Sequence, residues 1–151
     1  MSDNIKYNRP VRILVAEDDE DDRSFLSDAF SKIEIVNSIE FVENGQELLS
    51  YLKTASKLPD LIFLDLNMPL VDGMEALSAI KENIDFKKLP IIILTTSKNQ
   101  EHIYKTYMKG ISAYIVKPFT YEALNEMIKK TTDFYFKVAT LPTEQEQNWW
   151  S

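Results

Sequence analysis

The fold of this chain is decided by the stretch Leu61-Ile62-Phe63-Leu64-Asp65-Leu66-Asn67-Met68-Pro69. A short apolar run that ends at a proline turn is typical of a strand buried on both faces, as in a parallel sheet. Pro69 has no N–H to donate to a strand ladder, so we expect the strand to end before it. Asp65 then lies at, or just inside, the carboxyl end of a central strand. Because burying a carboxylate is costly, we expect Asp65 to have a partner there.

The rest of the chain alternates short apolar runs with helical patterns. We expect further strands at Val11–Ala16, Ile35–Val42, Ile91–Thr95 and Ala113–Val116. Apolar spacing predicts a helix after each strand, the fourth starting at a Ser97–Gln100 capping box and the last capped by Thr120. Alternation of five strands with five helices predicts an α/β fold: a flavodoxin-like, doubly wound parallel sheet of order 2-1-3-4-5. We expect one domain over residues 11–138, after a flexible segment 1–10 and before a tail 139–151.

Composition and charge disfavour several classes of protein. The 151 residues carry a formal net charge of −7, whereas nucleic-acid binding needs a basic face. The chain has no cysteine and therefore no disulfide or thiolate metal ligand. No apolar run approaches the roughly 20 residues of a membrane helix, and residues 1–10 lack the apolar core of a signal peptide. We expect a soluble cytoplasmic protein that binds neither nucleic acid nor membrane.

Polar residues follow the strands at one edge of the predicted sheet. Glu17 and Asp18 follow the first strand and Asp65 the third, Thr95 ends the fourth, and Lys117 follows the fifth. Because parallel strands end at the same edge, we expect these side chains to line one pocket. Carboxylates that share a pocket repel each other unless a cation joins them.

The ligands available in this pocket are oxygen atoms, which favour Mg²⁺ or Mn²⁺ over Zn²⁺. Asp18 and Asp65 would hold the cation, with Glu17 contributing through water. A backbone carbonyl near Asn67 would add another ligand. This arrangement leaves room for one phosphoryl oxygen.

The pocket also has the groups needed to receive a phosphoryl group. A carboxylate such as Asp65 is a known nucleophile for phosphoryl groups and forms an aspartyl phosphate. Lys117 would supply a point charge opposite the cation, and the Thr95 hydroxyl would donate to a phosphoryl oxygen. Positioning and charge neutralisation are most of what such a transfer needs. The residues therefore predict a metal-assisted phosphoacceptor at Asp65.

This constellation resembles the receiver domain of two-component response regulators. The matching segments are Glu17-Asp18, Leu64-Asp65-Leu66-Asn67-Met68-Pro69, Asp72-Gly73, Leu94-Thr95-Thr96-Ser97 and Lys117-Pro118-Phe119. The resemblance spans Arg12 to Lys130. One departure is mild: the acidic pair begins with glutamate, where the family often has aspartate.

The resemblance implies a Mg²⁺-dependent reaction in which Asp65 accepts a phosphoryl group from a sensor histidine kinase. Asp18, Asp65 and the Asn67 carbonyl would bind the metal ion, and Glu17 would contribute through water. The domain would not be an ordinary enzyme, because it would show only intrinsic self-phosphorylation and slow self-dephosphorylation.

The resemblance also implies how the signal would leave the domain. Thr95 and Lys117 would sense the phosphoryl group. Tyr114 lies where the family has a switch aromatic, although plain strand packing explains a tyrosine there equally well. We expect no attached output domain, so phosphorylation would change a protein-interaction surface on the fourth helix, fifth strand and fifth helix. A role as a phosphate sink or shuttle in a phosphorelay is the alternative.

A narrower resemblance is to the stand-alone regulators that partner bacterial phytochrome kinases. It rests on Leu94-Thr95-Thr96-Ser97 together with Asp133-Phe134-Tyr135-Phe136-Lys137-Val138 and Leu141-Pro142. Those regulators share an extended last helix and often form dimers.

The aromatic cluster of the last helix predicts a covered surface. The helical pattern places Phe134 and Tyr135 on the core stripe and Phe136 off it. A helix that is apolar on more than one side is usually covered by something. We expect a homodimer along the fourth helix, fifth strand and fifth helix; in the alternative, the tail folds back and covers the cluster with Trp149 or Trp150.

Other interpretations of these residues remain open in the sequence. The acids at 19–22 suit a solvated first helical turn, and His102 is expected to be solvated. A haloacid-dehalogenase-type phosphatase also uses a strand-end aspartate, but Asn67 stands where that class needs a proton-transferring aspartate. An FMN carrier shares the topology but would need a phosphate-binding loop where six acids lie. The remaining alternative is a receiver-shaped binding module that never takes phosphate.

Overall fold

A computed structural model describes residues 11–142, with Asn37 described by its backbone only, and shows a parallel sheet at its centre. The strands are paired in the order β2-β1-β3-β4-β5. The prediction of a flavodoxin-like doubly wound sheet is therefore confirmed. The strands are β1 Val11–Ala16, β2 Val36–Val42, β3 Leu61–Leu64, β4 Ile91–Thr95 and β5 Ala113–Val116.

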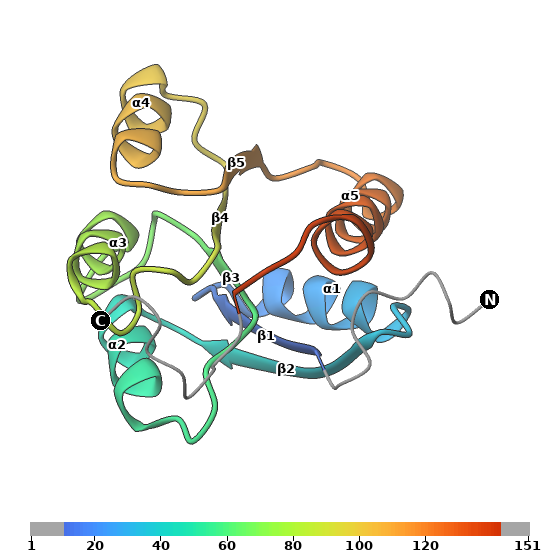
Figure 1. Cartoon of the computed structure of the whole chain (residues 1–151). Helices are drawn as coiled ribbons and strands as arrows, with labels where there is room; N and C mark the ends of the chain where they lie inside the picture. Colours follow the sequence, from blue (N-terminus) through green and yellow to red (C-terminus); the bar gives the residue numbers. More distant parts are fainter. Residues whose placement is uncertain (1–10, 143–151) are drawn as a thin grey trace.

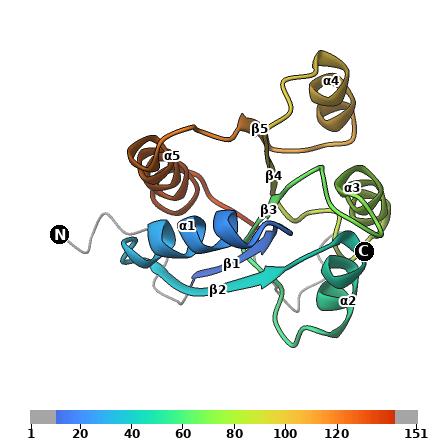
Figure 2. The ribbon, with the colours of Figure 1, turned by 180° about the vertical axis from the view of Figure 1, so that it is seen from behind.

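The helices cover both faces of this sheet. Figures 1 and 2 show α1 beside α5 on one face and α2 beside α3 on the other. After α5 the chain continues into a π-helical turn over Phe134–Val138. None of the described helices is long and apolar enough to cross a membrane. The helices are α1 Glu20–Ser31, α2 Gly45–Thr54, α3 Gly73–Glu82, α4 Gln100–Met108 and α5 Tyr121–Asp133.

Two hydrophobic cores lie on opposite faces of the sheet. Successive side chains of a strand point to opposite faces, so Leu14 of β1 packs on the α2–α3 side and Ile13 on the α1–α5 side. β3 is buried along its whole length because it lies between β1 and β4 with helices over both faces. The sheet edge at which Asp65 emerges is thus held by packing from two sides.

The helix starts confirm one predicted cap and correct another. The Thr120 hydroxyl accepts a hydrogen bond from the Ala123 N–H at 3.1 Å, as predicted for the start of α5. The prediction of Ser97 as the cap of α4 is wrong, because Asn99 caps it and accepts from the Glu101 N–H at 2.8 Å. Ser97 lies two residues before this cap, and its hydroxyl bonds to the ring of His102 instead.

The prediction for the aromatic cluster is wrong for Phe134 and Phe136 but confirmed for Tyr135, which is half-buried against the α1–α5-side core. Phe136 is 0% exposed and belongs to the α1–α5-side core, whereas Phe134 is 52% exposed. Ile128, Thr132 and Phe136 are all buried and lie four residues apart, so they form one face of the helix. Phe136 therefore cannot belong to a dimer surface. The alternative in which Trp149 or Trp150 covers the cluster lies outside the described residues.

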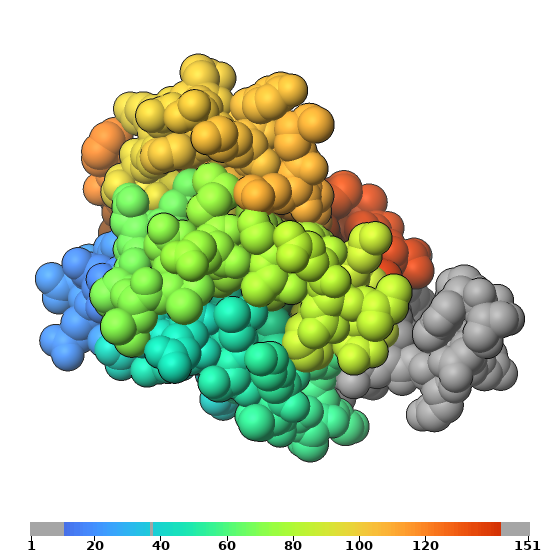
Figure 3. All heavy atoms as spheres, turned by 90° about the vertical axis from the view of Figure 1, so that its left-hand side faces the viewer, coloured from blue at the N-terminus to red at the C-terminus, as the bar shows by residue number. Residues whose placement is uncertain are grey.

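Helix α4 is held more loosely than the other helices. Thr106 is its only buried residue, and Tyr104, Tyr107 and Met108 are exposed. In Figure 3 the gold atoms of α4 stand at the top edge of the molecule, above α3. The Tyr107 hydroxyl accepts from the Tyr114 N–H of β5 at 3.2 Å, which ties the helix to the edge of the sheet.

Candidate functional site

Three carboxylates converge at the carboxyl edge of the sheet. Glu17 and Asp18 follow β1, and Asp65 follows the neighbouring strand β3. One oxygen atom of each lies within 4.8 Å of the others. Glu17 and Asp65 are buried while Asp18 is exposed. The structure thus brings together the predicted acidic residues at the predicted edge.

The loop after β1 is fixed by hydrogen bonds to the start of α1. The Arg23 guanidinium donates to the backbone carbonyls of Glu17 at 3.1 Å and Asp18 at 2.8 Å. The Asp19 N–H donates to Glu17 Oε2 at 3.1 Å, and the Asp19 carboxylate caps the helix. These bonds hold the acidic pair in one orientation before any ligand binds.

The loop after β3 is fixed by close backbone packing. The Asp65 N–H donates to the Ala16 carbonyl at 3.1 Å, and the Gly73 N–H donates to the Leu66 carbonyl at 3.1 Å. A Cβ atom at Gly73 would overlap the backbone of Asp65 and Leu66, so glycine is needed for this close approach. The start of α3 therefore supports the Asp65 backbone directly.

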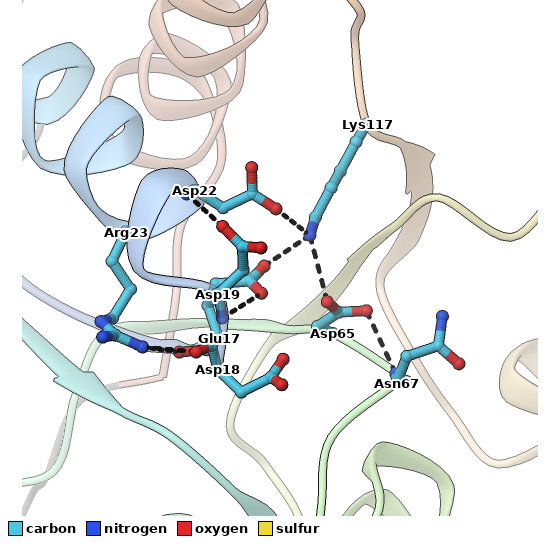
Figure 4. Close-up of polar contacts among 8 residues, drawn as sticks. All are labelled: Glu17, Asp18, Asp19, Asp22, Arg23, Asp65, Asn67 and Lys117. Atoms are coloured by element: carbon cyan, nitrogen blue, oxygen red, sulfur yellow. Dashed lines mark hydrogen bonds and ion pairs between the residues drawn. The ribbon is translucent and has the colours of Figure 1, made fainter.

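Asn67 bonds to Asp65 through its backbone. Its N–H donates to Asp65 Oδ1 at 3.2 Å. Its side chain is exposed, and in Figure 4 its amide points away from the carboxylates. Asn67 thus helps to orient the Asp65 carboxylate.

Lys117 reaches into the carboxylate cluster from the loop after β5. Its Nζ lies 2.6 Å from Glu17 Oε1, 2.7 Å from Asp22 Oδ2 and 3.1 Å from Asp65 Oδ2 (Figure 4). Its backbone N–H donates to the Thr95 carbonyl at 2.8 Å. Asp65 therefore has the cationic partner that its burial requires.

The pKa values of Glu17 and Lys117 are shifted by their buried, highly charged surroundings. Burial is the main cause that raises the pKa of Glu17 from 4.5 to about 7; the charge of Asp65 adds to it and the bond to Lys117 opposes it. Burial alone would lower the pKa of Lys117, but hydrogen bonds to Asp22 and Glu17 outweigh it and raise that pKa well above its ordinary value. The one ammonium group of Lys117 contacts several carboxylates and cannot neutralise them all, so the pocket favours the binding of an additional cation.

Thr95 brings an unused hydroxyl to the same sheet edge. It ends β4, next to the strand that leads into Asp65, and it is fully buried. Its Oγ1 has no hydrogen-bond partner among the described residues. A buried polar atom without a partner costs stability, so this hydroxyl is available to a ligand of the pocket.

The residues present fit a hard divalent cation. Glu17, Asp18 and Asp65 supply carboxylate oxygen atoms, which Mg²⁺ and Mn²⁺ prefer. The chain has no cysteine, and its one histidine, His102, lies on α4. The predicted choice of metal agrees with the chemistry of this donor set.

Two residues interpreted as solvated have specific partners. Asp22 bonds to Lys117, although the sequence was interpreted as placing it in a solvated first turn with its neighbours. Asp22 lies in the first turn of α1 rather than at a strand end, so the rule that placed the other acids gave no signal for it. His102 is half-buried, with Nδ1 at 2.8 Å from the Ser97 hydroxyl.

Tyr114 connects β5 to the loop that precedes α4. Its half-buried side chain packs against the α2–α3-side core, and its hydroxyl donates to the Ser97 carbonyl at 2.9 Å. Ser97 lies two residues after Thr95 along the chain. Tyr114 is thus bonded to the segment that leaves the candidate site.

This arrangement of acids, lysine and hydroxyl belongs to a known class of protein. The chain matches the family described as response regulator receiver domain over residues 13–129. It therefore belongs to the receiver domain family of two-component systems, whose members are phosphoacceptors rather than ordinary enzymes. Family membership also removes the support for a haloacid-dehalogenase-type phosphatase or an FMN carrier.

Individual relatives show which kind of member of this family the chain is similar to. The chain is 31% identical over 147 residues to response regulator Rcp1 of Synechocystis sp., which covers 94% of this chain and 99% of that protein. The phosphorylated cyanobacterial phytochrome response regulator RcpA has a similar structure, with a TM-score of 0.85, 31% identity and coverage of 89% of this chain and 100% of that one. The Mn²⁺-bound form of Rcp1 gives a TM-score of 0.83 at 30% identity, with the same coverage. The predicted resemblance to phytochrome-type regulators is confirmed.

Proposed function

We propose that this protein is a cytoplasmic response regulator whose Asp65 accepts a phosphoryl group from a sensor histidine kinase of the phytochrome type. The observation that carries this proposal is the buried Asp65 carboxylate, held between Lys117 and the other acids of the cluster. The similarity to a cyanobacterial phytochrome response regulator supports the choice of kinase.

The transfer follows from the groups around Asp65. A carboxylate oxygen of Asp65 attacks the phosphorus of the kinase phosphohistidine, the P–N bond breaks, and the imidazole nitrogen keeps the electron pair and takes a proton. In this transfer Lys117 would contact one phosphoryl oxygen, and the Thr95 hydroxyl, which has no hydrogen-bond partner within the described part of the chain, would donate to another.

A divalent cation would be held at the same place by Asp18 and Asp65, with Glu17 contributing through water and the Asn67 carbonyl as a further ligand. The carboxylate cluster supports this assignment, and one relative is known in a manganese-bound form. When bound, Mg²⁺ or Mn²⁺ neutralises charge on the carboxylates and on the phosphoryl oxygens.

Incubation with acetyl phosphate and Mg²⁺ tests this function. We expect mass spectrometry to find one added phosphoryl group, on the peptide that contains Asp65, and none when a chelator removes the metal. Transfer from a phosphorylated phytochrome-type kinase should give the same product. A protein that stays unmodified with both donors, or that releases phosphate over many turnovers, would contradict the proposal.

We propose that α4, β5 and α5 form the surface through which the signal leaves the domain. The same surface would form the interface of a homodimer. Tyr104, Tyr107 and Met108 of α4 are exposed, and Phe134, which follows α5, is exposed as well. Phosphorylation would change this surface through Thr95 and Tyr114, because Tyr114 bonds to the segment that follows Thr95. Such apolar exposure favours contact with a protein partner.

A substitution at Phe134 tests the dimer. We expect Phe134→Asp to reduce the sedimenting mass from dimer to monomer, because a charge would replace an exposed apolar ring at the interface. Ile84→Asp is the control, since Ile84 is also an exposed apolar residue but lies in the loop after α3. An equal mass for the parent protein and the Phe134 variant would contradict this surface.

A further inference from the structure

Asp22 is the partner of Lys117 to which the proposed reaction assigns no role. The ammonium of Lys117 has three N–H donors. Among the described residues, three carboxylates lie within hydrogen-bonding distance of it: Glu17 at 2.6 Å, Asp22 at 2.7 Å and Asp65 at 3.1 Å. Each donor therefore has one carboxylate to bond, and Asp22 holds the ammonium as closely as Glu17 does.

Asp22 differs from the other two partners in its relation to the candidate metal site. Glu17 and Asp65 belong, with Asp18, to the cluster that fits a divalent cation, and Asp22 does not. A cation and a phosphoryl group would both draw on the oxygen atoms of Glu17 and Asp65. Of these three carboxylates, only Asp22 would bind neither the cation nor the phosphoryl group, so it would stay free to hold Lys117.

The backbone fixes the position of Asp22. It lies in the first turn of α1, and its N–H donates to the capping carboxylate of Asp19 at 2.9 Å. The adjacent Arg23 is bonded to the carbonyls of the loop after β1. Figure 4 shows the Lys117 nitrogen between the carboxylates of Asp22 and Asp65. Asp22 is thus a fixed anchor from which Lys117 reaches Asp65.

We infer that Asp22 is a positioning residue that keeps the Lys117 ammonium beside Asp65 during phosphoryl transfer. This inference rests on the function proposed above. Without Asp22, the ammonium would shift toward Glu17, because it already lies closer to Glu17 than to Asp65. It would then compete with the cation for Glu17 and leave the phosphoryl oxygens on Asp65 less neutralised.

Phosphorylation kinetics with acetyl phosphate at saturating Mg²⁺ test the role of Asp22. We expect Asp22→Ala to lower the initial rate of modification about three- to tenfold, the effect of losing one charge-assisted hydrogen bond. Asp22→Asn keeps an oxygen acceptor for Lys117, so we expect it to recover most of that rate. In a separate titration of the same reaction with Mg²⁺, the concentration that gives half-maximal rate should rise in Asp22→Ala.

Asp21→Ala is the matched control for this experiment. It removes the same charge from the same helical turn, but Asp21 is not among the carboxylates that contact Lys117. We expect its rate to stay within about twofold of the parent rate, since an exposed charge is well screened. Thermal melting of each variant checks that the fold is retained.

The possible results separate the two proposals. A parent protein that takes up no phosphoryl group contradicts the phosphoacceptor function itself. A parent that is modified, with Asp22→Ala equally fast or faster, overturns only the positioning role. Faster modification of both the Ala and the Asn variant would show that repulsion between Asp22 and the phosphodonor outweighs any positioning effect.

Discussion

An Asp65→Asn variant is expected to take up no phosphoryl group from acetyl phosphate or from a kinase. The amide oxygen is not a competent nucleophile, while the side chain keeps its size in a buried position. Lys117 would still have Glu17 and Asp22 as partners, so the surrounding loops should hold their positions. The expected effect is therefore a complete loss of modification in a folded protein.

Intact-protein mass spectrometry after incubation with Mg²⁺ and phosphodonor measures this loss. Asp85→Asn is the control, because it makes the same chemical change at an exposed residue in the loop after α3. That variant should be phosphorylated like the parent. If the Asp65→Asn variant were phosphorylated on Asp18 or Asp22 as fast as the parent, Asp65 would not be the acceptor and another carboxylate would have that role.

Replacing Lys117 with methionine is expected to destabilise the metal-free protein by about 2–4 kcal/mol, because buried Glu17 and Asp65 would lose the ammonium between them. Methionine keeps much of the side-chain volume, so the loss reports charge more than packing. Mg²⁺ should stabilise this variant more than the parent, since the cation would then relieve a repulsion that nothing else offsets.

Urea unfolding of parent and variant measures the free energy of unfolding of each, once with a chelator present and once with Mg²⁺. Lys105→Met serves as the control, because Lys105 forms an exposed pair with Glu101 at 3.6 Å and such pairs contribute at most about 1 kcal/mol. A Lys117→Met variant as stable as its parent in chelator would show that the ammonium is not what stabilises the buried carboxylates.

The site could be predicted because its parts obey a topological rule. Parallel strands end at one edge, so each polar residue that follows an apolar run is directed to the same place. Glu17, Asp18, Asp65 and Lys117 meet there in the structure, although Lys117 lies 52 residues after Asp65. This convergence follows from the strand topology alone and does not depend on how the side chains pack.

Asp22 could not be placed by the same rule. It lies in a helix rather than at a strand end, and its bond to Lys117 spans 95 residues. Only the packing of α1 against the sheet decides whether a first-turn acid faces the pocket or the solvent. In the sequence, the general preference for acids in a first helical turn is enough to account for an aspartate at position 22, so nothing there predicts a partner for it.

The last helix shows a second limit. Three adjacent aromatic residues fit several phases of a helical pattern, and the apolar spacing of this helix predicts Phe134 on the core side. The structure instead buries Phe136, in line with Ile128 and Thr132. Because neighbouring positions on a helix differ by about 100° in direction, an error of two positions moves a side chain to another face.

Because α4 has few contacts with the rest of the domain, displacing it should cost little free energy. Beyond buried Thr106, the side-chain hydrogen bonds that join α4 to described segments outside its own ends are the bond between Tyr107 and β5 and the pair formed by His102 and Ser97. A net contribution of about 1 kcal/mol for each such bond is small beside the free energy that a bound protein partner supplies. Displacing this helix would leave the two cores that surround the sheet intact, so the domain is able to change its outline while its interior stays fixed.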